Sequence, residues 1–127
     1  MAEATIDAGT FKALQETAGV EFVVDLVDTF LEEAPVMLRS LRDALAARDA
    51  EKFRRVAHSL KSNALTFGAL GFAAMARELE LGGLERAAAA TQPVEALAGE
   101  YARVAAALTE LRNACAAPRR GPPAGGG

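Results

Sequence analysis

Residues 50–67 read AEKFRRVAHSLKSNALTF, and their apolar side chains recur every three or four positions. With 3.6 residues per turn, this spacing places them on one face of a helix. Asp49 is a good N-cap for a helix from Ala50 to Phe67, and Gly68 is expected to end it. The stretch therefore predicts an amphipathic helix with one buried stripe. The stripe consists of Phe53, Val56, Ala57, Leu60, Ala64 and Phe67.

The chain before this segment predicts two further helices. A short one is expected from Gly9 to Ala18, and a long one from Val20 to about Ala47. Pro35 lies inside the long one and removes the backbone hydrogen bond to the carbonyl of Leu31. Because the apolar steps keep their phase across Pro35, one kinked helix is favoured, with a break at Pro35 as the alternative.

The chain after Gly68 predicts two more helices. One is expected from about Ala69 to Leu81, stopping at Gly82-Gly83, with a stray helical turn in the alanines at 87–90. Thr91 is a suitable cap for the last helix, and Pro93 suits its first turn. The buried stripe of this helix is expected at Leu97, Tyr101, Val104, Leu108 and Leu111.

These segments together predict an all-α fold: an antiparallel four-helix bundle with a short extra N-terminal helix. Hydrophobic residues make up 51% of the 127 residues, and about thirty of them are alanine, the best helix former. The bundle domain is expected over residues 6–114. Residues 115–127, which end in PRRGPPAGGG, are expected to form a disordered Pro/Gly tail.

The composition excludes several classes of function. A single cysteine rules out a disulfide framework and a multi-thiolate zinc site within one chain, and a single histidine rules out a His-pair metal motif. The net charge of −3 argues against non-specific nucleic-acid binding. Neither a signal peptide nor a membrane-spanning run is visible, so a cytoplasmic protein is expected.

The single histidine, His58, is predicted to be accessible on the flank of the helix at residues 50–67. At 100° per residue it projects about 140° from Phe53, well off the buried stripe. Lys61 lies one turn after His58, and Arg54 lies one turn before His58. Ser62 and Leu65 lie on the same flank. A neutral imidazole is a nucleophile, and neighbouring cations favour a phosphorylated ring. A solvated side chain between basic residues is the alternative.

Other clusters have simpler interpretations. Phe11 and Leu14 are read as a cap on the core, with a partner-facing patch as the alternative. Two glutamate pairs, Glu32 with Glu33 and Glu78 with Glu80, are interpreted as parts of solvated helix faces. A basic cluster consists of Lys52, Arg54 and Arg55. This cluster could either steer an acidic partner or only be solvated.

Residues 57–64, AHSLKSNA, followed by Gly68-Ala69, resemble the signature of histidine-containing phosphotransfer (HPt) domains. The family pattern is roughly H-x-L-K-G-S-[SA] and then a Gly-Ala pair. The segments 30–33 (FLEE) and 78–80 (ELE), together with Asp49, match further elements of the family. The resemblance extends from about Ile6 to Leu111.

This resemblance implies a phosphorelay intermediate. His58 would accept a phosphoryl group from a receiver-domain aspartyl phosphate of a hybrid sensor kinase, on the ring nitrogen farther from the backbone. It would then pass the group to a second receiver, of a response regulator. Lys61 would be the electrostatic partner, and Arg54, Ser62 and Leu65 would face the receiver. The receiver would supply Mg²⁺, so this chain is expected to need no cofactor, metal or nucleotide and to have no kinase activity of its own.

Two departures from the pattern and two alternative functions stay open at this point. Ser62 stands where the family usually has glycine, which narrows the space beside the imidazole, and Asn63 replaces the usual serine. One alternative is a helical adaptor that binds receivers without carrying phosphate. The other is the phosphotransfer domain of a chemotaxis-type kinase. A monomer is expected, with no nucleic-acid or membrane partner.

Overall fold

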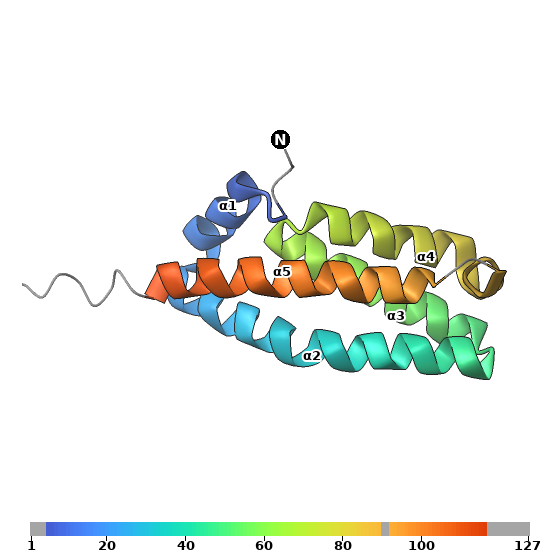
Figure 1. Cartoon of the computed structure of the whole chain (residues 1–127). Coiled ribbons are helices and arrows are strands. Elements are labelled where there is room, and N and C mark those ends of the chain that lie inside the picture. The colour runs from blue at the N-terminus through green and yellow to red at the C-terminus, as the bar shows by residue number, and fades with distance from the viewer. Residues whose placement is uncertain (1–4, 90–91, 117–127) are drawn as a thin grey trace, which may run out of the picture.

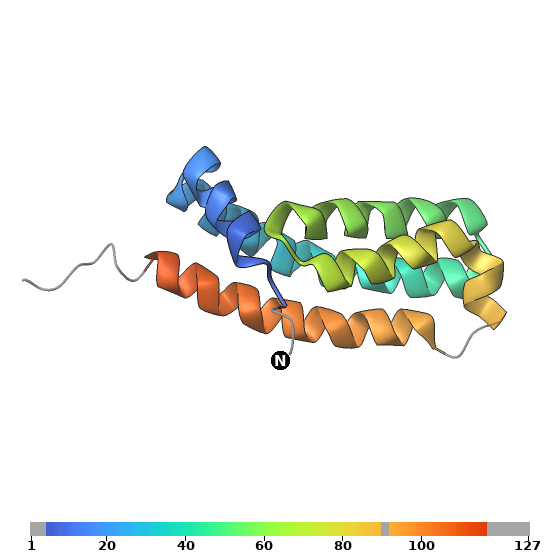
Figure 2. The same ribbon diagram turned by 90° about the horizontal axis from the view of Figure 1, so that it is seen from above.

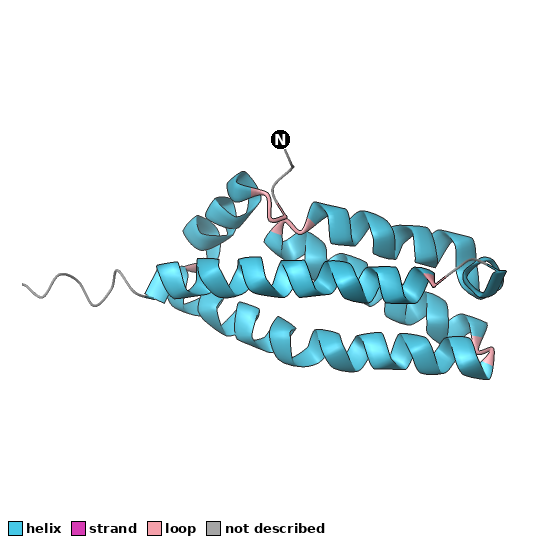
Figure 3. Cartoon of the chain, viewed as in Figure 1, coloured by secondary structure: helices cyan, strands magenta, loops and turns pink. Residues whose placement is uncertain are grey.

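The computed structural model describes residues 5–89 and 92–116, which form five helices (Figures 1 and 3). Four of them pack side by side as an antiparallel bundle, and α1 lies across one end of it (Figures 1 and 2). The predicted four-helix bundle with a short extra N-terminal helix is therefore confirmed. The helices are α1 (Ala8–Ala18), α2 (Val20–Ala47), α3 (Ala50–Phe67), α4 (Leu70–Ala89) and α5 (Pro93–Ala116).

Helix α2 runs without interruption past Pro35, so the alternative of two separate helices is wrong. Proline has no N–H, which leaves the carbonyl of Leu31 without its usual partner in the helix. The Tyr101 hydroxyl of α5 donates a hydrogen bond to this carbonyl at 3.3 Å. Burial raises the pKa of Tyr101, which keeps the hydroxyl protonated and able to donate.

The core is built from the apolar stripes of the five helices. Phe53, Leu60 and Phe72 are fully buried, and Phe11 of α1 is 3% exposed, so Phe11 caps the core as expected. An aromatic cluster joins the four helices of the bundle. The ring centroid of Phe30 in α2 lies 5.4 Å from that of Phe67 in α3 and 6.0 Å from that of Tyr101 in α5, and the Tyr101 centroid lies 6.4 Å from that of Phe72 in α4. Small residues bring α3 and α4 close together: Ala57, Ala64, Ala73 and Ala76 are all buried.

Two helix ends differ from the prediction. The expected break at Gly82-Gly83 is present as a kink, where Gly83 leaves the helical conformation with φ 77°, but the helical segment that follows it to Ala89 is longer than the turn expected at residues 87–90. This segment continues because Leu84 and Ala87 are buried. Helix α5 continues to Ala116, past the predicted end of the bundle domain at residue 114, and Cys115 is buried.

The expected cap at Thr91 and the remaining part of the predicted tail lie outside the described residues.

The turn between α3 and α4 fixes the N-terminal segment. Gly68 adopts a left-handed conformation, with φ 83°, and its carbonyl accepts a hydrogen bond from the Asp7 N–H at 2.8 Å. The Asp7 carboxylate in turn caps α1 by accepting from the Thr10 N–H at 2.9 Å. A Cβ atom at position 68 would lie 2.8 Å from the Thr10 Cβ, so this close approach requires glycine.

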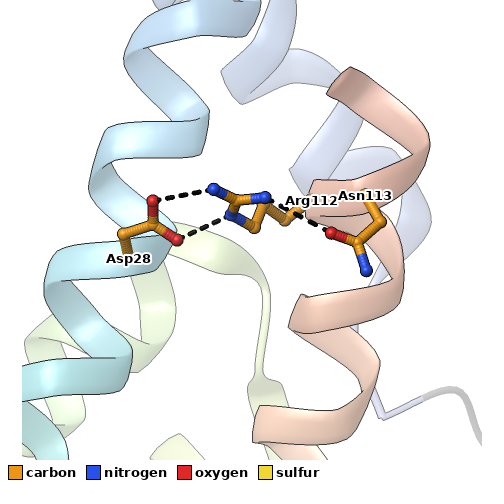
Figure 4. Close-up of polar contacts among 3 residues, drawn as sticks. All are labelled: Asp28, Arg112 and Asn113. Atoms are coloured by element: carbon orange, nitrogen blue, oxygen red, sulfur yellow. Dashed lines mark hydrogen bonds and ion pairs between the residues drawn. The ribbon is translucent and has the colours of Figure 1, made fainter. Parts of the chain in front are cut away.

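Two bidentate ion pairs set the register of α2 against α5. At one end, the Arg112 guanidinium donates to both carboxylate oxygens of Asp28 at 2.6 and 3.0 Å, and also to the Asn113 side chain (Figure 4). At the other end, Arg42 donates to Glu95 at 2.7 and 3.0 Å. Such paired bonds add geometric specificity to the packing of the two helices.

Within the described residues, none of the helices combines the length and the apolar character needed to cross a membrane.

Candidate functional site

The site is centred on His58, which lies in the middle of α3 on its exposed flank. Its side chain is 56% exposed, whereas its neighbours Ala57 and Leu60 are fully buried. The apolar stripe of α3 thus fixes the direction in which the imidazole points. The ring is accessible to an approaching macromolecule, as the helical projection predicts.

Glu80 of α4 connects the two residues at the centre of the site. Its Oε2 lies 2.8 Å from His58 Nδ1, and its Oε1 lies 2.9 Å from Lys61 Nζ. The Glu80 side chain is only 16% exposed. The interpretation of Glu80 as part of a solvated helix face is therefore wrong. The small residues between α3 and α4 let the carboxylate lie against the next helix rather than in water.

The contact with Glu80 determines the protonation pattern of the imidazole. A carboxylate only accepts hydrogen bonds, so His58 Nδ1 must carry the proton. In a neutral ring, Nε2 then keeps its lone pair and is the nucleophilic atom. The carboxylate itself stays ionised. The Lys61 ammonium group, 2.9 Å from Oε1, lowers the pKa of Glu80; partial burial opposes this shift, and His58 reinforces it.

The remaining predicted site residues lie around this centre. Lys61 is 22% exposed and is held by Glu80 rather than extended into solvent. Arg54 and Ser62 are exposed, each one turn from His58, and Leu65 is 47% exposed near the end of α3. The structure thus brings Lys61 and His58 together through Glu80. Arg54, Ser62 and Leu65 share the accessible flank, and none of the three forms a hydrogen bond or ion pair with the imidazole.

A shallow groove between α2 and α3 lies on the other side of this flank. Its volume is about 110 Å³. Asn63 projects toward α2 here, with its Nδ2 at 3.8 Å from the Met37 sulfur. Asn63 therefore lines this groove, a location that the sequence alone did not predict. Its lining consists of Leu26, Thr29, Phe30, Glu33, Asn63, Thr66 and Phe67.

The described part of the chain holds no group of three or more histidine, cysteine, aspartate or glutamate residues that could bind a metal ion. The residues around His58 supply an accessible imidazole, oriented by a carboxylate and flanked by a lysine.

Comparison with known proteins identifies the family of this chain. A family model described as "Hpt domain" matches residues 25–115 of the chain. The chain belongs to the Hpt domain family. Hpt domains carry phosphoryl groups in two-component phosphorelays, so this Hpt domain has a phosphotransfer role.

A solved structure supports the same assignment of this Hpt domain. The crystal structure of histidine-containing phosphotransfer protein B (HptB) from Pseudomonas aeruginosa PAO1 is 32% identical in sequence and similar in fold, with a TM-score of 0.78. The match covers 88% of this chain and 97% of that one. No protein in the curated collection searched by sequence matches this chain.

Proposed function

We propose that His58 carries the phosphoryl group of this Hpt domain. It accepts the group from the aspartyl phosphate of one receiver domain, in a hybrid sensor kinase, and passes it to the aspartate of a second receiver, in a response regulator. The observation that carries this proposal is the 2.8 Å contact between His58 Nδ1 and Glu80 Oε2, which leaves Nε2 as the nucleophile on an exposed ring. The chain has no other histidine that could do this chemistry.

In the transfer step, the Nε2 lone pair of His58 forms a bond to phosphorus. The bond between phosphorus and the aspartate oxygen breaks, and the carboxylate of the donor leaves with the electron pair. The ring keeps its Nδ1 proton and acquires a positive charge, which the ionised Glu80 stabilises. Transfer to the second receiver reverses these events, and a neutral imidazole leaves. No proton has to be removed from the ring in either direction.

Lys61 is proposed as the electrostatic partner of the phosphoryl oxygens. Its ammonium group lies 2.9 Å from Glu80, on the same side of α3 as the imidazole. A flexible four-carbon stem allows this point charge to reach the phosphoryl group while it stays close to the carboxylate. We assign no metal or cofactor to the chain itself, and the Mg²⁺ that offsets phosphoryl charge is assigned to the receiver.

The receiver is proposed to dock over the exposed flank of α3. Arg54 offers positive charge to an acidic receiver surface, and Leu65 offers apolar area at the opposite end of the flank. Ser62 lies between them and sets the space beside the imidazole. The proposed role is transfer alone, without kinase activity in this chain.

Labelling by a phosphorylated receiver tests the proposal. The wild-type protein is mixed with a receiver domain carrying ³²P-aspartyl phosphate, and the product is expected to be acid-labile and alkali-stable, as phosphohistidine is. The matched variant His58→Gln should acquire no such label. Label on that variant contradicts the assignment of His58. A wild-type protein that binds the receiver but stays unlabelled is an adaptor. Labelling that requires a catalytic kinase domain with ATP indicates the chemotaxis-type alternative.

A further inference from the structure

The outer face of the first two turns of α2 carries three exposed residues: Glu21, Phe22 and Asp25. We call this surface the α2 outer face. Phe22 is 54% exposed, which is unusual for a phenylalanine in a domain whose other described phenylalanines are buried. Neither Glu21 nor Asp25 forms an ion pair with another described residue, and Asp25 interacts with Arg112 only through a longer-range electrostatic attraction. An aromatic ring flanked by two carboxylates is thus left uncovered.

The end of α5 lies close to the α2 outer face. Arg112, in the last turns of α5, is held by Asp28, which lies only one turn after Asp25 (Figure 4). Cys115 is buried and accepts a hydrogen bond from Gln15 of α1. The last described residue of α5 is therefore fixed at the same end of the bundle as the start of α2 (Figures 1 and 2). The chain after Ala116 therefore begins near the start of α2.

The sequence that follows α5 complements the α2 outer face in charge. The order of its arginines and prolines along the chain also matches the order of the carboxylates and the phenylalanine around α2. Residues 117–127 read APRRGPPAGGG, with two arginines and no acidic residue. The arginines come first and the proline pair Pro122-Pro123 comes later. Asp28 faces Arg112 of α5, which defines the α5 side of α2. At 100° per residue, Glu21 and Asp25 project within about 60° of Asp28, whereas Phe22 projects about 120° away from it, so the carboxylates lie nearer to α5 than the ring does.

The reach of the segment also fits. An extended chain covers about 3.3 Å per residue, so Arg120 can lie about 13 Å beyond Ala116 and Pro123 about 23 Å beyond it. Half the circumference of a helix about 10 to 12 Å wide is about 16 to 19 Å. The arginines can therefore reach the carboxylates, and the prolines can reach Phe22 on the other side.

We propose that residues 117–127 dock on the α2 outer face, with the two arginines paired with Glu21 and Asp25 and the proline pair packed on the ring of Phe22. Exposed ion pairs are individually weak and screened by salt, but a tether gives the segment a high effective concentration at this surface. Phe22 lies one turn before Leu26, which lines the groove between α2 and α3. A docked segment would therefore compete with a partner that enters this groove. The docking itself does not depend on phosphoryl transfer.

Paramagnetic broadening in the full-length chain tests this proposal. A nitroxide is attached to Ala124→Cys in a Cys115→Ser background, and amide signals are recorded with the label oxidised and reduced. Broadening is expected at Phe22 and Asp25, and it should exceed that at Glu110, which lies on α5 nearer to the tether. Raising the salt from about 0.05 M to 0.5 M should reduce the broadening at Phe22 at least twofold.

Charge reversal supplies the matched control. Arg119→Glu with Arg120→Glu should abolish the excess broadening at Phe22, and adding Glu21→Lys with Asp25→Lys should restore it. Equal broadening in the wild-type and reversed tails would overturn the proposal, because a tail that only diffuses near its tether ignores charge. Broadening that arises only when spin-labelled chains are mixed with isotope-labelled ones would also overturn it. The segment would then occupy a second copy.

Discussion

Replacing Glu80 by glutamine is expected to slow the phosphorylation of His58 about fivefold. Glutamine keeps the shape of the side chain and can still accept from Nδ1, but it lacks the charge that stabilises the positive ring. A hydrogen bond to a charged group contributes about 1.5 to 3 kcal/mol, against about 0.5 to 1.5 kcal/mol for a neutral one. The difference, about 1 to 1.5 kcal/mol, corresponds to roughly 5- to 12-fold in rate. The ring is 56% exposed and solvent screens part of this, so we take the lower end.

The rate is measured with phosphoramidate, a small phosphoryl donor, so that receiver docking does not enter the result. Glu78→Gln is the matched control, because it removes the same charge from an exposed position two residues away on α4. The control should phosphorylate at the wild-type rate. Circular dichroism checks that both variants stay folded. Equal rates for wild type and Glu80→Gln would refute the reasoning that the carboxylate stabilises the charged ring.

The dependence on pH follows from the same carboxylate. Lys61 lowers the pKa of Glu80 below its ordinary value of 4.5 in the folded protein. Ionised Glu80 therefore contributes its full share to the free energy of unfolding above pH 4.5. This contribution is lost only as the pH falls through the lowered pKa of Glu80 in the folded protein. The Lys61→Met variant should lose it at a higher pH than the wild type, as followed by the carboxyl ¹³C shift of Glu80.

Three other substitutions have definite expected outcomes. Tyr101→Phe removes the hydrogen bond to the Leu31 carbonyl and should lower the free energy of unfolding by about 1 kcal/mol in urea denaturation, whereas an unchanged midpoint would show that water replaces the hydroxyl. Gly68→Ala places a Cβ against Thr10 at positive φ and should cost at least about 1 kcal/mol, with faster amide exchange in α1. Ser62→Gly should cost about 0.5 to 1 kcal/mol of stability and speed transfer from a receiver but not from phosphoramidate. Equal acceleration with both donors would contradict the role given to the space beside the ring.

The sequence was sufficient to predict those features that repeat along one helix. The stripe from Phe53 to Phe67 gave both ends of α3 and the exposed position of His58, because period and caps are local. The unbroken phase across Pro35 similarly predicted a continuous α2. These predictions needed no knowledge of neighbouring helices.

Features that depend on contact between helices were not predictable in this way. Glu80 looked like one of several exposed carboxylates, since its role depends on how closely α4 approaches α3. The resemblance of residues 78–80 to an element of the family was the only signal that could have singled it out. The full length of the helix beyond Gly83 and the buried Cys115 were not predicted for the same reason: their burial comes from partners far away in the sequence.

The bond from Tyr101 to the Leu31 carbonyl makes two distant positions dependent on each other. If Pro35 were replaced by alanine, a backbone N–H would return to satisfy Leu31 from within α2, and the tyrosine hydroxyl would become redundant. The cost of Tyr101→Phe should therefore shrink in a Pro35→Ala background, a non-additivity that a double-mutant cycle measures directly. The order of the two substitutions therefore matters for stability: loss of the hydroxyl should cost less after the proline has been replaced than before.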